Sequence, residues 1–210
     1  MALDHEEQEQ LAALKAWWDE HGNLVFLLVI AIALAVAGWR GWDWYQTRQS
    51  TQASTLYEML TRAAQTGDAK TMRDASGALA VDYPRTLYAS MGALVSARYY
   101  FDHHDLKGAK AQLEWVLEHS RSDDMKDLAR LRLAAVLLDE KAYDDALKQL
   151  DAPHAAAYAA QYAALKGDVL VAKHESNKAK AAYQIALDKA NKGDNAFRQS
   201  VRIRLEALGG

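Results

Sequence analysis

The residues whose types could do chemistry in this 210-residue chain form three short groups. The run from Asp102 to Asp105 reads Asp-His-His-Asp, yet four adjacent residues supply at most two or three metal ligands. Residues 123–124 and 144–145 are carboxylate pairs of the kind used as acid and base. All three groups fall in predicted turns or at helix starts, where Asp and His are ordinary turn and capping residues. We therefore expect no catalytic residue and no metal site.

Composition excludes several other functional classes. The chain has no cysteine, which rules out disulfides, thiol catalysis and cysteine-ligated metals. It also lacks a Ser-His-Asp elbow, a glycine-rich phosphate loop and a zincin helix. The formal net charge is −3, and basic residues are interleaved with acids, so nucleic acid is not an expected partner. We expect a protein that is not an enzyme and has no cofactor.

An apolar run covers residues 22–39. It contains no charged side chain, and 18 residues of helix rise by about 27 Å, close to the thickness of a bilayer core. Five tryptophans bracket the run as membrane-interface residues would: Trp17, Trp18, Trp39, Trp42 and Trp44. The pattern predicts one transmembrane helix, with the lipid bilayer as a partner.

Three alternatives to a membrane span fit less well. A buried helix of a soluble domain is seldom apolar on every face for five turns. A surface-lying or re-entrant helix needs a polar face, which residues 24–37 lack. Residues 35–37 resemble a signal-peptide cleavage site, but residues 1–21 carry six acidic residues against Lys15 alone, where a secretory n-region is basic.

The rest of the chain has helical composition and one expected domain. We divide the sequence into an acidic tail at 1–21, the span and its aromatic flank at 22–45, and a helical domain at 46–210. A short helix is also expected over residues 3–18. Helices of the domain are predicted near 50–65, 69–81, 86–101, 106–119, 124–140, 143–150, 155–173, 177–191 and 195–207. No stretch alternates as a strand, so the expected fold class is all-α.

An internal repeat defines the predicted architecture. Residues 99–109, 136–146 and 169–179 superpose without gaps, and each copy ends on an alanine. A small residue lies twelve positions before that alanine and a bulky one four positions after it. The copies are 37 and 33 residues apart, close to the 34 of a tetratricopeptide repeat. Such helix pairs stack into a curved superhelix with an exposed concave wall, although another helical bundle would share part of the pattern.

First-helix residues line the concave wall of such a solenoid, which makes them candidate partner-binding residues here. The repeat register places on the wall Met91, Leu94, Arg98, Phe101, Leu128, Leu131, Ala135 and Leu138.

The whole chain resembles the YfgM family, the ancillary subunits of the SecYEG translocon in Gram-negative bacteria. The resemblance rests on residues 6–8 and 14–18, on the Gly-Trp-Arg-Gly-Trp element at 38–42, and on residues 128–134 and 165–168. It implies a single-pass inner-membrane protein with a cytoplasmic N-terminus and a periplasmic tetratricopeptide-like domain. It also implies association with the SecYEG translocon and with PpiD, a membrane-anchored periplasmic chaperone.

The flanking charges do not themselves favour that orientation, since Lys15 precedes the span and Arg40 and Arg48 follow it. The expected function is a membrane-anchored scaffold that binds protein partners at the Sec translocon and links it to periplasmic chaperones. The alternatives are a scaffold of another envelope assembly, and an enzyme or regulator with dispersed site residues. Convergent ionisable groups in one deep pocket would favour the enzyme, and an open groove the scaffold.

Overall fold

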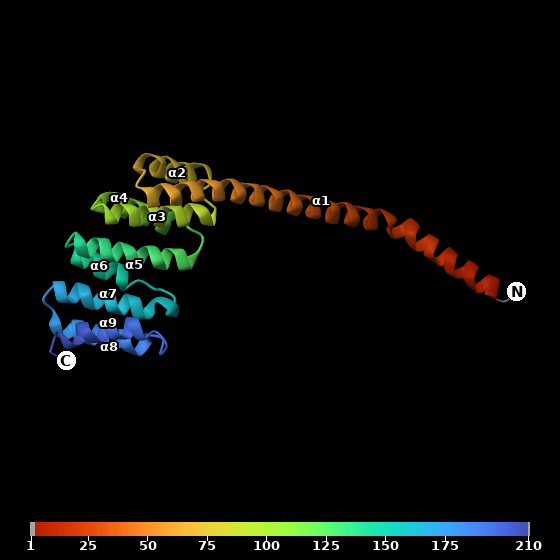
Figure 1. Cartoon of the computed structure of the whole chain (residues 1–210). Helices are drawn as coiled ribbons and strands as arrows, with labels where there is room; N and C mark the ends of the chain where they lie inside the picture. The colour runs from red at the N-terminus through yellow and green to blue at the C-terminus, as the bar shows by residue number, and fades with distance from the viewer. Residues whose placement is uncertain (1–2, 210) are drawn as a thin grey trace. The chain divides into compact units, whose positions relative to one another are not determined.

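The computed structural model describes the backbone of residues 3–209 and the side chains of residues 9–209. Every regular element in this part of the chain is helical, which confirms the all-α prediction (Figure 1). The elements are α1 (Leu3–Thr66), α2 (Ala69–Asp82), α3 (Leu87–Asp102), α4 (Leu106–His119), α5 (Asp123–Asp139), α6 (Tyr143–Leu150), the 3-10 helix η1 (Ala156–Tyr158), α7 (Ala159–Ala172), α8 (Ser176–Lys189) and α9 (Asn195–Glu206). The acidic side chains of Asp4, Glu6 and Glu7, part of the predicted tail, lie outside this description.

Contacts along the chain divide it into two units, Met1–Gln49 and Ser50–Gly210, and α1 contributes to both. The predicted helix over residues 3–18 is part of α1 rather than a separate element. No backbone turn interrupts α1 before Gly67, whose φ of 77° lies in the left-handed region. The predicted limits at residues 21 and 45 concern the bilayer and stay predictions.

The helix pairs of the second unit are joined by one recurring turn. His104, Lys141 and His174 have φ values of 61°, 61° and 62° at the same position of the three sequence copies. Gly67 takes the equivalent position between α1 and α2. Left-handed backbone is uncommon for residues other than glycine and ends a helix sharply. The recurrence of this conformation confirms the repeat register, and the pair that ends near residues 82–84, where the sequence predicts a weaker fourth copy, shares the same turn.

Backbone hydrogen bonds close these turns in the same way. The N–H of Asp105 donates to the carbonyl of Tyr100 over 2.9 Å. The N–H of Ala142 donates to Leu137 over 2.8 Å, and that of Glu175 to Leu170 over 2.9 Å. This bond between residues five apart is the Schellman motif, which satisfies a carbonyl at the end of the first helix. Each turn therefore reverses the chain into an antiparallel helix pair.

Small and large residues meet between the paired helices as the repeat predicted. The three repeat alanines, Ala109, Ala146 and Ala179, have no exposed surface. The bulky positions are also buried, with Tyr183 only 2% exposed. A Cβ atom added to Gly167 would overlap the ring of Tyr183, so only glycine allows these two helices to approach so closely.

The third pair, α5 with α6, and the start of the next pair at α7 both depart from the repeat. Helix α6 has eight residues where α4 and α8 have 14, and the predicted helix over 155–173 begins late, as η1 followed by α7. Buried Asp127 holds the intervening loop, because its Oδ2 accepts a hydrogen bond from the N–H of Ala155 over 2.8 Å. The hydroxyl of Tyr162 donates to the Asp127 carbonyl over 2.8 Å. The prediction was therefore wrong at this helix start, and a tertiary contact explains the difference.

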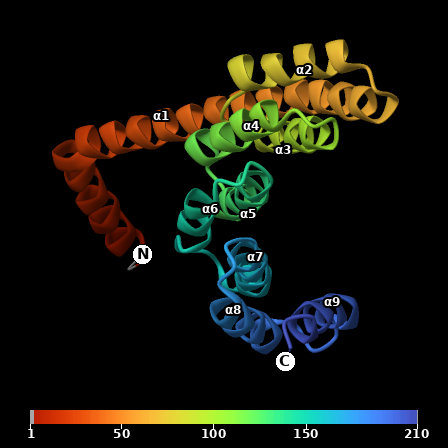
Figure 2. The ribbon, with the colours of Figure 1, turned by 90° about the vertical axis from the view of Figure 1, so that its left-hand side faces the viewer.

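The helix pairs stack in chain order. The second helix of one pair packs on the first helix of the next, α4 on α5 and α6 on α7, and α9 covers α8. First helices also contact each other, α3 with α5 and α5 with α7, whereas α4, α6 and α8 approach one another less closely. The stack therefore curves toward the first helices, and α3, α5 and α7 form its concave wall (Figure 2).

Candidate partner-binding surface

The concave wall keeps most, but not all, of its predicted residues accessible. Leu94 is 5% exposed and belongs to the core cluster that also holds Leu113 and Leu133. Its inclusion in the candidate surface is therefore corrected, since the packing of α5 covers it. The half-buried members are Met91, Phe101, Leu128, Leu131, Ala135 and Leu138. The leucines and Phe101 pack against the same core, so one side of each side chain is held by the core while the other side is exposed.

A groove of about 140 Å³ opens in this wall between α3 and α5. Helix α3 contributes Arg98 and Phe101 to it, and α5 contributes Arg132 and Ala135. The full lining is Ala97, Arg98, Phe101, Leu113, Arg132, Ala135 and Val136. The groove thus combines an apolar floor with two guanidinium groups.

The two arginines of the groove differ in their partners. The Nε of Arg98 donates to Asp102 over 2.7 Å in an exposed ion pair. Arg132 donates from Nη1 to the carbonyl of Leu94 over 3.3 Å, and no carboxylate of the described side chains forms an ion pair with it. Burial lowers the pKa of Arg132, and the positive charge of Arg98 lowers it further. An arginine stays charged at neutral pH, so this part of the groove is positive.

Sequence reasoning did not select Arg132 as a site residue. The residue stands between Leu131 and Leu133, where an isolated cation suggests a solvated face. The usable signal was its spacing from Leu128 and Ala135, because positions three and four apart share a helix face.

The five tryptophans predicted to lie at the membrane interface all belong to the first unit and are exposed. Their exposed fractions run from 48% at Trp17 to 73% at Trp39. The guanidinium of Arg48 lies 5.4 Å from the ring centroid of Trp44, and the ring of Trp17 stacks on His21. Their role at a membrane interface stays a prediction.

The residues from Asp102 to Asp105 make structural contacts within the repeat domain. Asp102 pairs with Arg98, and Asp105 accepts a hydrogen bond from the N–H of Gly108 over 2.8 Å as the N-cap of α4. His103 stacks on Tyr99, with ring centroids 4.0 Å apart. Among the described residues, no group of three or more His, Asp or Glu side chains is placed to hold a metal ion.

A groove of about 760 Å³ lies beside α6, α7 and α8, where α6 ends early. Three lysines on its rim are held in ion pairs. Lys166 pairs with Asp151 over 2.5 Å, and Lys178 pairs with Glu175 over 2.6 Å. Lys173 lies 2.5 Å from Asp144. These charges are largely neutralised by neighbours within the repeat domain.

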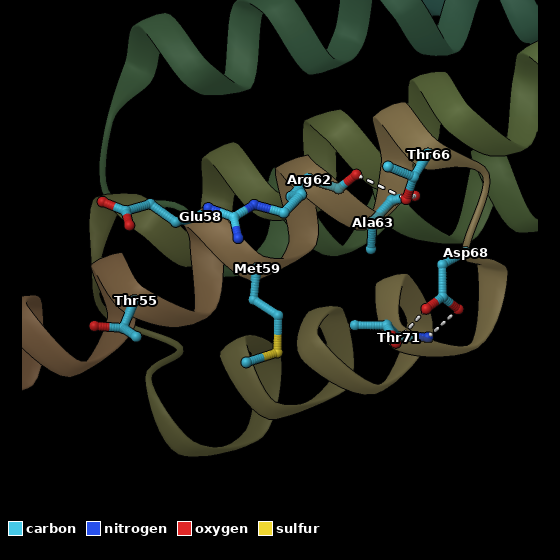
Figure 3. A pocket seen from close by; sticks show the side chains of 8 residues that line it. All are labelled: Thr55, Glu58, Met59, Arg62, Ala63, Thr66, Asp68 and Thr71. Atoms are coloured by element: carbon cyan, nitrogen blue, oxygen red, sulfur yellow. Dashed lines mark hydrogen bonds between the residues drawn. The ribbon is translucent and has the colours of Figure 1, made fainter.

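Another hollow, of about 350 Å³, lies between the end of α1 and α2 (Figure 3). Met59 projects into the space between the two helices. Asp68 caps α2 by accepting hydrogen bonds from the N–H and hydroxyl of Thr71, over 3.0 and 2.6 Å. The bonds from Thr71 lower the pKa of Asp68. The aspartate of this hollow is thus a helix cap.

The recurring turns, the stacked pairs and the concave wall define a tetratricopeptide-like protein with a long N-terminal apolar helix. The profile of the tetratricopeptide repeat-like domain family matches residues 15–210. No solved structure matches the chain.

Curated relatives match along nearly the whole chain. A Neisseria gonorrhoeae protein named "Ancillary SecYEG translocon subunit" is 32% identical over 99% of this chain and all of its own length. A protein of the same name from Haemophilus influenzae is 28% identical over 99% of this chain and all of its own length. Another from Escherichia coli K12 is 29% identical over 88% of this chain and 88% of its own length. The chain belongs to this family of ancillary SecYEG translocon subunits, the YfgM family, which confirms the resemblance seen in the sequence.

Proposed function

We propose that this protein is an inner-membrane-anchored scaffold of the Sec translocon whose repeat domain links the translocon to periplasmic chaperones. The observation that carries the proposal is the near-full-length similarity to ancillary SecYEG translocon subunits, at 32% identity over 99% of the chain for one relative. That similarity covers the apolar part of α1 as well as the repeats. The partners proposed are the translocon and a chaperone of the PpiD type.

The apolar part of α1 supports the anchor. The segment Glu9–Thr66 is a helix long and apolar enough to cross a membrane. Leu24 and Leu34 are 66% and 68% exposed, so their apolar surface is free to contact lipid. In the proposed arrangement residues 1–21 are cytoplasmic, residues 22–45 cross the inner membrane and meet its interface, and the repeat domain from residue 46 is periplasmic.

The concave wall supports the binding of polypeptides. It presents half-buried apolar side chains and an open groove between α3 and α5. Partners tethered to the same bilayer meet at a high effective concentration, so a weak groove interaction suffices. The wall would engage a periplasmic chaperone or an emerging chain, while the anchor contacts the translocon within the membrane.

Site-specific photocrosslinking in native membranes tests the proposal. Probes would replace Phe101 and Leu138 on the wall, and Trp39 and Trp42 beside the span. A control probe would replace Lys107, which is exposed on α4, a second helix of the stack. We expect the tryptophan positions to capture translocon subunits. We expect the wall positions to capture a periplasmic chaperone or emerging chains, well above the control.

Capture of a different envelope complex from both sets would favour a scaffold of another assembly. If neither set captured a protein above the control, and one small metabolite copurified with the protein, the scaffold proposal would be wrong.

A further inference from the structure

The groove between α3 and α5 contains an excess of positive charge that the repeat domain does not neutralise. Arg98 and Arg132 both line it, and Asp102 is paired only with Arg98. That ion pair uses Nε of Arg98. The two terminal amino groups of Arg98 have no hydrogen-bond partner among the described residues. Of the Arg132 nitrogens, Nη1 alone has such a partner, the carbonyl of Leu94.

Two neighbouring guanidinium groups with free donors favour a carboxylate as their partner. A guanidinium is a planar fork of N–H donors that matches the two oxygens of a carboxylate. The mutual repulsion of Arg98 and Arg132, which contributes to the lowered pKa of Arg132, would be relieved by a bound anion.

The apolar floor indicates what accompanies that carboxylate. The cavity of about 140 Å³ is lined by Phe101, Leu113 and Val136 as well as by the arginines. An apolar cavity of roughly 150 Å³ holds a group of benzene size, so one aliphatic or aromatic side chain fits. The wall continues on α5 through half-buried Leu131 and Leu138, which suits an extended segment rather than a small metabolite.

We propose that this groove binds an extended segment of a partner protein through an Asp or Glu side chain on Arg98 and Arg132, with the adjacent apolar side chain in the cavity. The inference rests on the proposed scaffold function and specifies the chemistry of what its wall recognises. Arg132 supplies selectivity for the acidic residue, and the cavity supplies selectivity for its apolar neighbour.

Two pools of octapeptides test this inference against the full chain in nanodiscs. The peptides are acetylated and amidated, with random sequence around a fixed central Glu-Leu or Gln-Leu pair. Retained peptides are quantified by mass spectrometry. We expect retention of the Glu pool to exceed that of the Gln pool about tenfold, as is typical of a charge-assisted hydrogen bond.

Variants separate the groove from general charge effects. Arg132→Gln should reduce the ratio of Glu-pool to Gln-pool retention to about one. Arg202→Gln, at an exposed arginine of α9, should leave this ratio unchanged. Arg132→Lys should restore part of it, because the charge returns without the planar fork. Equal thermal unfolding of the variants would show that the fold is retained.

Three results would overturn the inference: equal retention of both pools, a preference that survives Arg132→Gln, or retention no greater than on empty nanodiscs. The scaffold proposal would not fall with it, because crosslinking from Trp39 and Trp42 to the translocon does not depend on acidic peptides. If those crosslinks fail while the Glu preference holds, the translocon assignment fails and the groove chemistry stands.

Discussion

Both units of this chain are helical, but large apolar side chains are mostly exposed in the first unit and mostly buried in the second. Among the described side chains of Met1–Gln49 nearly all large apolar residues are exposed, with Phe26 at 63% and Leu34 at 68%. In Ser50–Gly210 most of the large apolar residues are fully or partly buried in three clusters, and residues such as Leu60 and Val116 have no exposed surface, although a few, Val81 among them, are exposed. Burial in the second unit depends on small residues that let helices pack closely.

In the proposed function, this difference assigns membrane anchoring to the first unit and partner recognition to the second. A helix that is apolar on all sides has no surface on which to position a selective polar group, but it suits lipid. A stack of amphipathic pairs buries one face of each helix and leaves the other available, as the wall with Arg98 and Arg132 shows.

The largest expected effect comes from placing charge in the exposed apolar stretch. Leu28 and Ile32 are 56% and 55% exposed and lie one turn apart on α1. The double change Leu28→Asp with Ile32→Asp should oppose membrane insertion by roughly 5–7 kcal/mol, since each Asp near a helix centre costs about 2.5–3.5 kcal/mol. We expect the protein to leave the membrane fraction after carbonate extraction.

A matched control places the same two charges on the repeat domain. Val81 and Ile203 are 77% and 56% exposed, and Val81→Asp with Ile203→Asp should leave the protein in the membrane fraction. If both double variants behaved alike, the two units would not differ as described.

An intermediate effect is expected where helices pack most closely in the repeat domain. Gly167→Ala should lower the free energy of unfolding by about 1–3 kcal/mol, because the new Cβ would overlap the ring of Tyr183. That ring cannot easily move, since its hydroxyl donates to Asp168 over 2.7 Å. Thermal unfolding followed by circular dichroism would measure the change.

The control is another glycine inside a helix. Gly77 of α2 is exposed, and a Cβ there would meet nothing within 4 Å. Gly77→Ala should therefore raise the stability by about 0.5–1 kcal/mol through the unfolded chain. An unchanged melting temperature for Gly167→Ala would contradict the close packing of α7 and α8.

The smallest effect concerns the recurring left-handed turn. Lys141 has a φ of 61°, which costs a residue with a side chain about 1–2 kcal/mol. Lys141→Gly should raise the free energy of unfolding by up to about 1 kcal/mol, after the greater flexibility of glycine in the unfolded chain is subtracted. Ala111→Gly, at an exposed position within α4, should lower it by about 1 kcal/mol. If Lys141→Gly lowered the free energy of unfolding as much as Ala111→Gly does, the left-handed conformation at Lys141 would be wrong.

Much of the fold could be predicted because the information is local. The spacing of apolar residues gave helix bounds within one or two residues for α2 to α6, α8 and α9. The small residues of the repeat marked helix contacts, since close packing requires them. The start of α7 was missed because buried Asp127, 28 residues before Ala155, holds the preceding loop. No local pattern contains such a tertiary contact.

The candidate surface was predictable only in outline. The repeat register placed Arg98 and Phe101 on the wall, and both line the groove. Leu94 has the same spacing but is covered, because a neighbouring pair packs over it. Arg132 was missed because its importance arises from the proximity of Arg98 on another helix, 34 positions earlier in the chain.

Cysteine labelling can test whether α1 crosses the membrane with the repeat domain in the periplasm, because the chain has no cysteine of its own. Glu9→Cys and Ala207→Cys each introduce one thiol at an exposed position. A membrane-impermeant maleimide would be added to intact cells with a permeable outer membrane. If the repeat domain is periplasmic, the cysteine at position 207 should be labelled at once, and that at position 9 only after the cells are broken. Labelling of position 9 in intact cells, or protection of position 207, would show that the proposed topology is wrong.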